Sequence, residues 1–173
     1  MAQQNLSVSS ETLPVQAPGI ILGIGLGGFF DGILLHQVLQ WHHMFSDVYS
    51  VNDVPGLEMN TLGDGIFHTV TWISVLVGLG ILYSRVTQQR RQVWGSRVLW
   101  GWMLVGWGLF NLIEGLIDHQ ILGIHHVHSG PNQLMWDMIF LASGVVLMVI
   151  GWMMARSGRP IGIAASEPMG RNG

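Results

Sequence analysis

Residues 29–43, FFDGILLHQVLQWHH, place one carboxylate and three histidines in an otherwise apolar stretch. The same pattern returns at residues 112–126 as LIEGLIDHQILGIHH. Aligned at an offset of 83 residues, segments 23–43 and 106–126 are identical at nine of 21 positions, several of them polar. Apolar helices resemble one another by chance, so the polar matches are the informative ones. The sequence therefore predicts an internal repeat.

The composition is typical of a membrane protein. Charged residues make up 10% of the 173-residue chain, against about 25% in soluble domains. A bilayer core needs about 20 apolar residues in a helix, and four segments reach that length. They run over residues 19–41, 62–84, 98–124 and 133–155. These segments have almost no polar face, which disfavours a water-soluble bundle.

We therefore expect an all-α fold, a four-transmembrane-helix bundle built from two parallel two-helix repeats. Pseudo-twofold symmetry about the membrane normal would relate the repeats. Repeat one would span residues 19–84 and repeat two residues 98–155, together forming the membrane domain 19–155. The tails, 1–18 and 156–173, are expected to be disordered cytoplasmic segments.

All seven basic residues are arginines, and they flank one end of the predicted spans. They are Arg85, Arg90, Arg91, Arg97, Arg156, Arg159 and Arg171. Loops 44–61 and 125–132 contain none, so the positive-inside rule places both termini in the cytoplasm. The short loop between spans two and three predicts that these spans are neighbours. A net charge of -3 without a basic groove argues against nucleic acid as a partner, whereas the lipid bilayer is an expected one.

The eight histidines gather at the opposite, external end of the spans. Ionisable groups within a span cost roughly 2.5–3.5 kcal/mol on insertion scales and usually serve a function. Imidazole suits zinc, copper, iron and nickel, and the lack of cysteine excludes thiolate and iron–sulfur sites. The candidate metal ligands are His36, His43, His119, His126, His68, His42, His125, Asp31, Glu114 and Asp137.

Helical spacing suggests how the histidines are arranged. His36 and His43 are seven residues apart and would share one helix face, as would His119 and His126. Glycines precede them on the same face, so we expect the two helices to approach there and present imidazoles to a common site. The two stripes are Gly25–Gly32–His36–His43 and Gly108–Gly115–His119–His126.

The acids Asp31 and Glu114 each precede a histidine by five residues, about 140° away in projection on an α-helix. They are expected to be ligands supplied to another helix, or acids that orient a ligand histidine through its second ring nitrogen.

Candidates on the second helix of each repeat are matched more loosely. His68 is expected to complete the first-half site, with Asp137 as its second-half counterpart. Asp64 is interpreted as a helix cap, and His128 as a loop residue.

The run FFDGILLHQVLQWHHM resembles a family of predicted bacterial integral membrane proteins classed as a domain of unknown function, over roughly residues 18–156. The residues that carry the resemblance are Asp31-Gly32-Ile33, His36 and Gln40-Trp41-His42-His43. It implies a multi-pass protein of the bacterial inner (cytoplasmic) membrane with no assigned reaction. The association of such genes with assembly factors for cytochrome c oxidase implies copper or haem handling, and respiratory oxidase or its assembly factors as partners.

The leading hypothesis is an integral membrane metal-binding protein with a duplicated His/carboxylate site near the periplasmic face. The transition metal would be copper, iron or zinc, used for copper handling or for redox or oxygen chemistry linked to respiratory oxidases. The enzyme form of this hypothesis is a membrane dimetal oxidoreductase.

Three alternatives stay open. One is a b-type haem electron carrier, with His36 facing His119 across haem b. Another is a proton-coupled transporter that uses Asp31 and Glu114. A third is a zinc hydrolase. The sequence leaves open the metal, the number of ions, the substrate and the oligomeric state, a homo-oligomer included.

Overall fold

The computed structural model describes residues 15–88 and 95–158, and over these the chain is all-α, as predicted. Four helices are long and apolar enough to cross a membrane. They are α1 (Gln16–Phe30), which continues as the π-helix η1 (Asp31–Val38); α2 (Val54–Gln88); α3 (Ser96–Glu114), which continues as the π-helix η2 (Gly115–Ile121); and α4 (Gln133–Ser157). The predicted disordered tails lie almost wholly outside the described residues.

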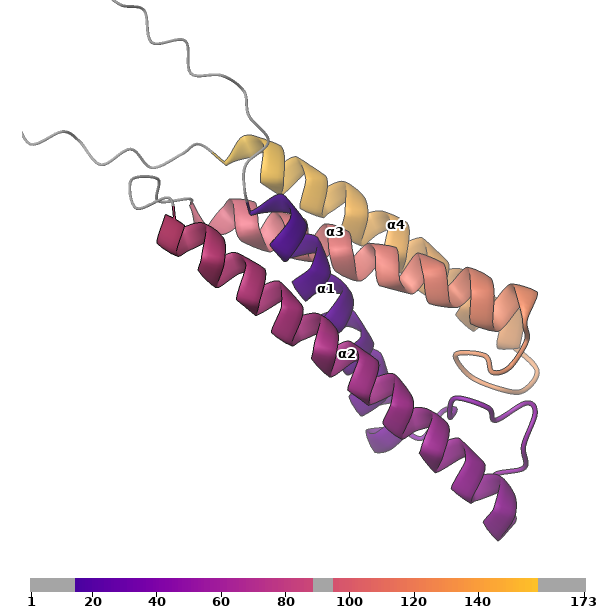
Figure 1. Cartoon of the computed structure of the whole chain (residues 1–173). Coiled ribbons are helices and arrows are strands. Elements are labelled where there is room, and N and C mark those ends of the chain that lie inside the picture. Colours follow the sequence, from indigo (N-terminus) through magenta and orange to yellow (C-terminus); the bar gives the residue numbers. More distant parts are fainter. Residues whose placement is uncertain (1–14, 89–94, 159–173) are drawn as a thin grey trace, which may run out of the picture.

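Helices α1 and α3 form the centre of the molecule (Figure 1). Helix α2 packs on α1, and α4 packs on α3, whereas among the described helices the backbone of α2 does not come close to that of α3 or α4. The prediction that spans two and three are neighbours is therefore wrong. Direct packing of α1 on α3 occupies the place that α2 would need.

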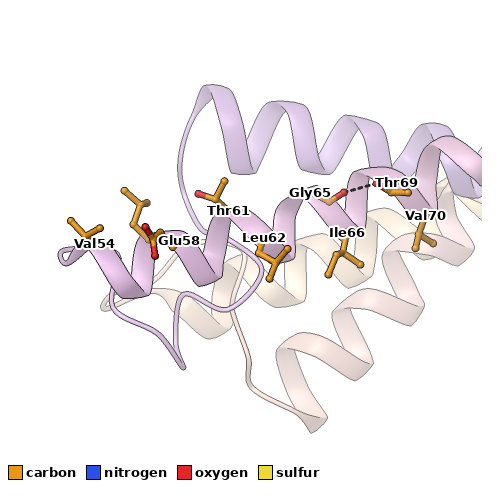
Figure 2. A pocket seen from close by; sticks show the side chains of 9 residues that line it. Val54, Glu58, Thr61, Leu62, Gly65, Ile66, Thr69 and Val70 are labelled. Atoms are coloured by element: carbon orange, nitrogen blue, oxygen red, sulfur yellow. Dashed lines mark hydrogen bonds between the residues drawn. The ribbon is translucent and has the colours of Figure 1, made fainter.

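The outer helices expose apolar side chains, as expected where they meet lipid. Figure 2 shows one such flank of α2, a shallow hollow lined from Val54 to Val70 by residues of this helix alone. No second element brings a chemical group to it, so this hollow is not a candidate site.

Two glycines set the close crossing of α1 and α3. A methyl group on Gly23 would collide with the backbone oxygen of Met103, and one on Gly106 would collide with the backbone of Ile20. Gly27, one turn after Gly23, also packs against α3, at Trp107. Small residues at this spacing let helix backbones approach closely in lipid.

The glycine stripes were predicted to bring the two central helices together, and this is wrong. Gly25 packs against Thr71 of α2, and Gly108 packs against Gly144 of α4. Residues two apart on a helix point to nearly opposite sides, so Gly23 meets α3 while Gly25 meets α2. The stripe glycines seat the outer helices on the central pair.

Helix α2 begins at Val54, well before the predicted start of the second span. Asp64 is therefore an interior residue, and its interpretation as a cap is wrong. Asp53 fulfils that role, because its Oδ1 accepts a hydrogen bond from the Gly56 N–H at 2.8 Å.

The charged ends of the helices agree with the predicted asymmetry. Arg85, Arg97 and Arg156 lie near the helix ends opposite the two long loops, 39–53 and 122–132 (Figure 1). The other arginines, Arg90, Arg91, Arg159 and Arg171, lie outside the described residues. Assignment of the arginine end to the cytoplasm stays a prediction.

The close crossing of α1 and α3 leads to a testable prediction about Gly23. Gly23→Leu should lower the free energy of unfolding by about 1–3 kcal/mol, as overpacking does, because its side chain meets backbone atoms that cannot move aside. Thermal unfolding in detergent measures the loss. Gly80→Leu is the matched control, since a methyl group there meets nothing within 4 Å. Equal stability of the two variants would contradict the described crossing.

Candidate metal centre

Each central helix widens into a π-helix where the ionisable residues begin. A π-helix closes i→i+5 hydrogen bonds, so side chains five residues apart come to lie nearly above one another. His36 Nε2 accordingly lies 3.1 Å from Asp31 Oδ2. The separation of about 140° predicted for an α-helix is wrong here, because η1 is not an α-helix.

The chain leaves both π-helices through the same turn. Gln40 has a φ of 50°, and its repeat counterpart Gly123 has a φ of 57°. Around Gln40, the Trp41 N–H donates to the Leu35 oxygen at 2.9 Å, a six-residue closure typical of helix C-termini. The second repeat makes the same closing bond. These turns fold the histidine pairs that follow back onto the helix ends.

Six buried side chains converge where the π-helices and these turns meet, and we call them the central cluster. Their ligand atoms form overlapping groups of three residues, each group within 4.8 Å. No member is more than 3% exposed. The central cluster consists of Asp31, His36, His42, Glu114, His119 and His125.

His42 and His125 cross between the repeats. Their rings stack with centroids 4.7 Å apart and planes at 5°. His42 Nδ1 donates to the Val127 oxygen at 2.9 Å, and His125 Nδ1 donates to the Met44 oxygen at 3.0 Å. Each ring is thus oriented by the backbone of the other repeat, which leaves its Nε2 lone pair facing the central cluster.

Both crossing histidines are held in the form that binds metals. Burial lowers the pKa of His42 to about 3, despite the opposing effect of Asp31. Burial also lowers the pKa of His125 to about 3, and the neighbouring His119 and His36 act in the same direction. Both rings are therefore neutral at neutral pH, and a neutral imidazole is the metal-binding form.

A carboxylate from α2 supports the first-repeat histidines from behind. Asp64 accepts hydrogen bonds from His36 Nδ1 at 2.8 Å and His43 Nδ1 at 2.7 Å. It also accepts one from the Met44 N–H at 2.8 Å. A carboxylate bonded to the second ring nitrogen fixes the tautomer of a ligand histidine and raises its basicity.

Asp137 of α4 has the same place in the second repeat. Its carboxylate accepts a hydrogen bond from His126 Nδ1 at 2.6 Å and one from the Val127 N–H at 3.1 Å. It also lies 3.5 Å from His119 Nδ1. The contacts of the two repeats thus correspond residue by residue, while the rotation axis relating them stays a prediction.

The counterpart of Asp137 is Asp64, and the predicted match with His68 is wrong. His68 Nδ1 bonds to the backbone oxygen of Asp64 at 2.7 Å, within its own helix. A sequence signal for the correct match exists, because Asp64-Gly-Ile-Phe67 aligns with Asp137-Met-Ile-Phe140. The aligned phenylalanines also match in space, Phe67 lying against His36 and Phe140 against His119.

The structure brings together six of the ten predicted ligands and leaves four outside the central cluster. His43 and His126 lie on the outer side of the two supporting carboxylates, and His126 Nε2 is 3.5 Å from Asp47 of the external loop. His128 is an exposed loop residue, as predicted. The four outside are His43, His68, His126 and Asp137.

The central cluster concentrates unpaired polar atoms. Of the ten buried side-chain nitrogens and oxygens without a hydrogen-bond partner in the described part of the chain, eight belong to it. They include Nε2 of all four histidines and both oxygens of Glu114. A buried polar group without a partner costs about 1–3 kcal/mol. The donor set fits a metal ion, which would pair with every one of these ligand types at once.

The chain belongs to the family described as predicted membrane protein (DUF2243), whose model matches residues 18–158. This match confirms the predicted membership of a membrane-protein family without an assigned function. No curated protein and no solved structure matches the chain.

The hydrogen bonds of Asp64 give a test of the site's architecture. Asp64→Leu removes the acceptor of four hydrogen bonds, two of them from buried donors, and should destabilise the fold by about 3 kcal/mol or more. Asp64→Asn keeps one acceptor oxygen and should lose less. Chemical unfolding followed by tryptophan fluorescence measures both, with Glu58→Leu at an exposed position of α2 as control. If Asp64→Leu were as stable as the control, Asp64 would not have the described contacts.

Proposed function

We propose that this member of the DUF2243 family is an integral membrane metalloprotein that holds two transition-metal ions in the central cluster and uses them for redox chemistry. The convergence of seven unpaired atoms in one buried place carries the proposal: the Nε2 atoms of four histidines, Asp31 Oδ2 and both Glu114 oxygens. Metal–nitrogen and metal–oxygen bonds of about 2.0–2.2 Å place neighbouring ligand atoms roughly 3–4 Å apart. The closest acid–histidine pairs of the cluster, at 3.1, 3.7 and 3.9 Å, have that spacing.

By the repeat, we assign the ligands to two corresponding sets, although close groups of ligand atoms also join residues of both repeats. Asp31 with His36 and His42 forms one set, in which the carboxylate lies 3.1 and 3.9 Å from the two Nε2 atoms. Glu114 with His119 and His125 forms the other. Three ligands for each ion leave coordination positions open for a reactant. Six ligands on a single ion would occupy an octahedral shell completely.

The ligand type favours iron. Two histidines and one carboxylate with open positions are the ligand set of non-haem iron(II) oxygenases. Copper(I) prefers thiolate and thioether sulfur, and the central cluster contains neither. A structural zinc site would be closed and tetrahedral. Copper and zinc are therefore the alternatives that a metal analysis must exclude.

The packing disfavours the haem carrier and the transporter, because both need space inside the helix bundle. A haem between His36 and His119 requires a flat slot, yet the stacked rings of His42 and His125 contact both of these residues. A transport route to the arginine end would have to pass the close crossing of α1 and α3 at Gly23. The central cluster instead lies near the external ends of the helices, which we assign to the periplasmic side.

Metal content is the direct test of the proposal. Protein purified from iron-supplemented cells should contain about two iron ions per chain by elemental analysis. His36→Ala and His125→Ala should each lose at least about half of the iron, because each removes a ligand of one ion. His128→Ala and His68→Ala, with rings outside the central cluster, should retain it. Protein without stoichiometric metal would refute the function, and bound copper or zinc would refute the choice of iron.

The supporting carboxylates give an independent prediction. Asp64→Asn should weaken iron binding about 10–100-fold, as changes behind a ligand histidine do, and Asp137→Asn should do the same in the second repeat. Competition with a chromophoric chelator measures the affinity. Asp47→Asn, a change in the external loop, is the control. Unaltered affinity in both variants would show that neither acid orients a metal ligand.

A further inference from the structure

A second cavity adjoins the central cluster from the side. It has a volume of about 410 Å³ and lies between α1 and α4, with α3 behind it. Of the described helices, α1 and α4 make no contact with each other, so a gap separates them. We call this cavity the lateral groove. It is lined by Gly27, Asp31, Trp107, Asn111, Trp136 and Ser143, among others.

The inner end of the lateral groove adjoins the central cluster. Asp31 lines the groove and is also a member of the central cluster. The mouth carries Phe30 and Val146, which are 49% and 54% exposed on the helix surfaces that face lipid. The groove therefore connects the bilayer with the proposed metal ligands.

The residue that lines the groove at position 27 differs from its counterpart in the other repeat. Gly27 corresponds to Phe110 at the offset of 83 residues. The Phe110 ring packs 6.0 Å from the Phe67 ring, and a methyl group on Gly28 would contact it at 3.3 Å. Phe110 thus fills the matching position in the other half, whereas Gly27 lines the groove with the Trp107 ring packed against it.

The polar residues of the groove are asymmetric in the same way. Asn111 and Ser143 correspond to Gly28 and Val70 in the other half. Asn111 Nδ2 donates to Ser143 Oγ at 2.9 Å, which leaves the amide oxygen of Asn111 to accept a bond from a ligand. Asp31 also lines the groove, and its carboxylate is a second acceptor. The groove thus offers two acceptors between aromatic walls.

We infer that the lateral groove binds a hydroquinone-type ring with a hydrocarbon tail, which enters from the bilayer and lies beside the proposed metal centre. Its hydroxyl groups would donate to Asp31 and Asn111, the ring would lie among the tryptophans, and the tail would leave past Val146. No basic residue lines the groove, so an anionic lipid headgroup would be buried there without a counter-charge. The volume is within the range of small-molecule sites.

Calorimetric titration of the iron-loaded protein with decyl hydroquinone tests the inference, which rests on the proposed function. Wild type should bind one molecule. Val146→Trp, which fills the mouth, and Asn111→Leu, which removes an acceptor, should each weaken binding roughly tenfold or more. Val149→Trp is the matched control, because it makes the same change at an exposed position of α4 outside the groove.

Two controls separate this inference from the metal proposal. Iron content measured on the same samples should be unchanged in all three variants, so weaker binding cannot reflect a lost metal centre. Decanol, which carries the tail and a hydroxyl group without the ring, should bind far more weakly. Equal binding of decanol, or unaltered affinity in both groove variants, would overturn the inference while leaving the metal centre intact.

Discussion

The π-helical turn at Asp31–Val38 is the constraint on which the site depends. In an α-helix, the carboxylate of Asp31 would point about 140° away from His36. The wider turn aligns the two side chains, and the left-handed Gln40 then returns the chain so that His42 meets them. Regular α-helix already satisfies the backbone in a bilayer. A π-helix retained at the same place in both repeats is therefore best explained by the ligand geometry it creates.

Charge balance connects the two layers of carboxylates. Asp31 and Glu114 lie in the central cluster, and Asp64 and Asp137 lie behind the histidines, all four at most 3% exposed. The crossing histidines are neutral, and the described arginines, Arg85, Arg97 and Arg156, lie at the far ends of the helices. Isolated ionised carboxylates are very costly in a low-dielectric interior. Two divalent cations would neutralise four carboxylates without any additional charged residue.

Much of this arrangement could be predicted from the sequence, and the rest could not be predicted for physical reasons. Matched polar residues in two apolar segments predicted where the cluster lies and included all six of its members. An i+5 contact was not predicted, because nothing in the residue types distinguishes a π-helix from an α-helix. The pairing of Asp64 with Asp137 was missed because the second helices align at a different offset from the first. The glycines correctly predicted close packing of helices. Which helix each glycine packs against depends on which helices become neighbours.

The repeat and its asymmetry have different consequences for chemistry. Under the proposed function the duplicated ligands would hold two metal ions, but two open sides would let reactants approach from either half. The external side is covered, since the crossing bonds of His42 and His125 join the loops and Trp41 packs 5.3 Å from Trp136 above the site. Phe110 fills the flank beside α2, whereas the lateral groove opens on the flank beside α4. Under the proposed function, a groove that opens toward lipid would favour reactants that dissolve in the bilayer.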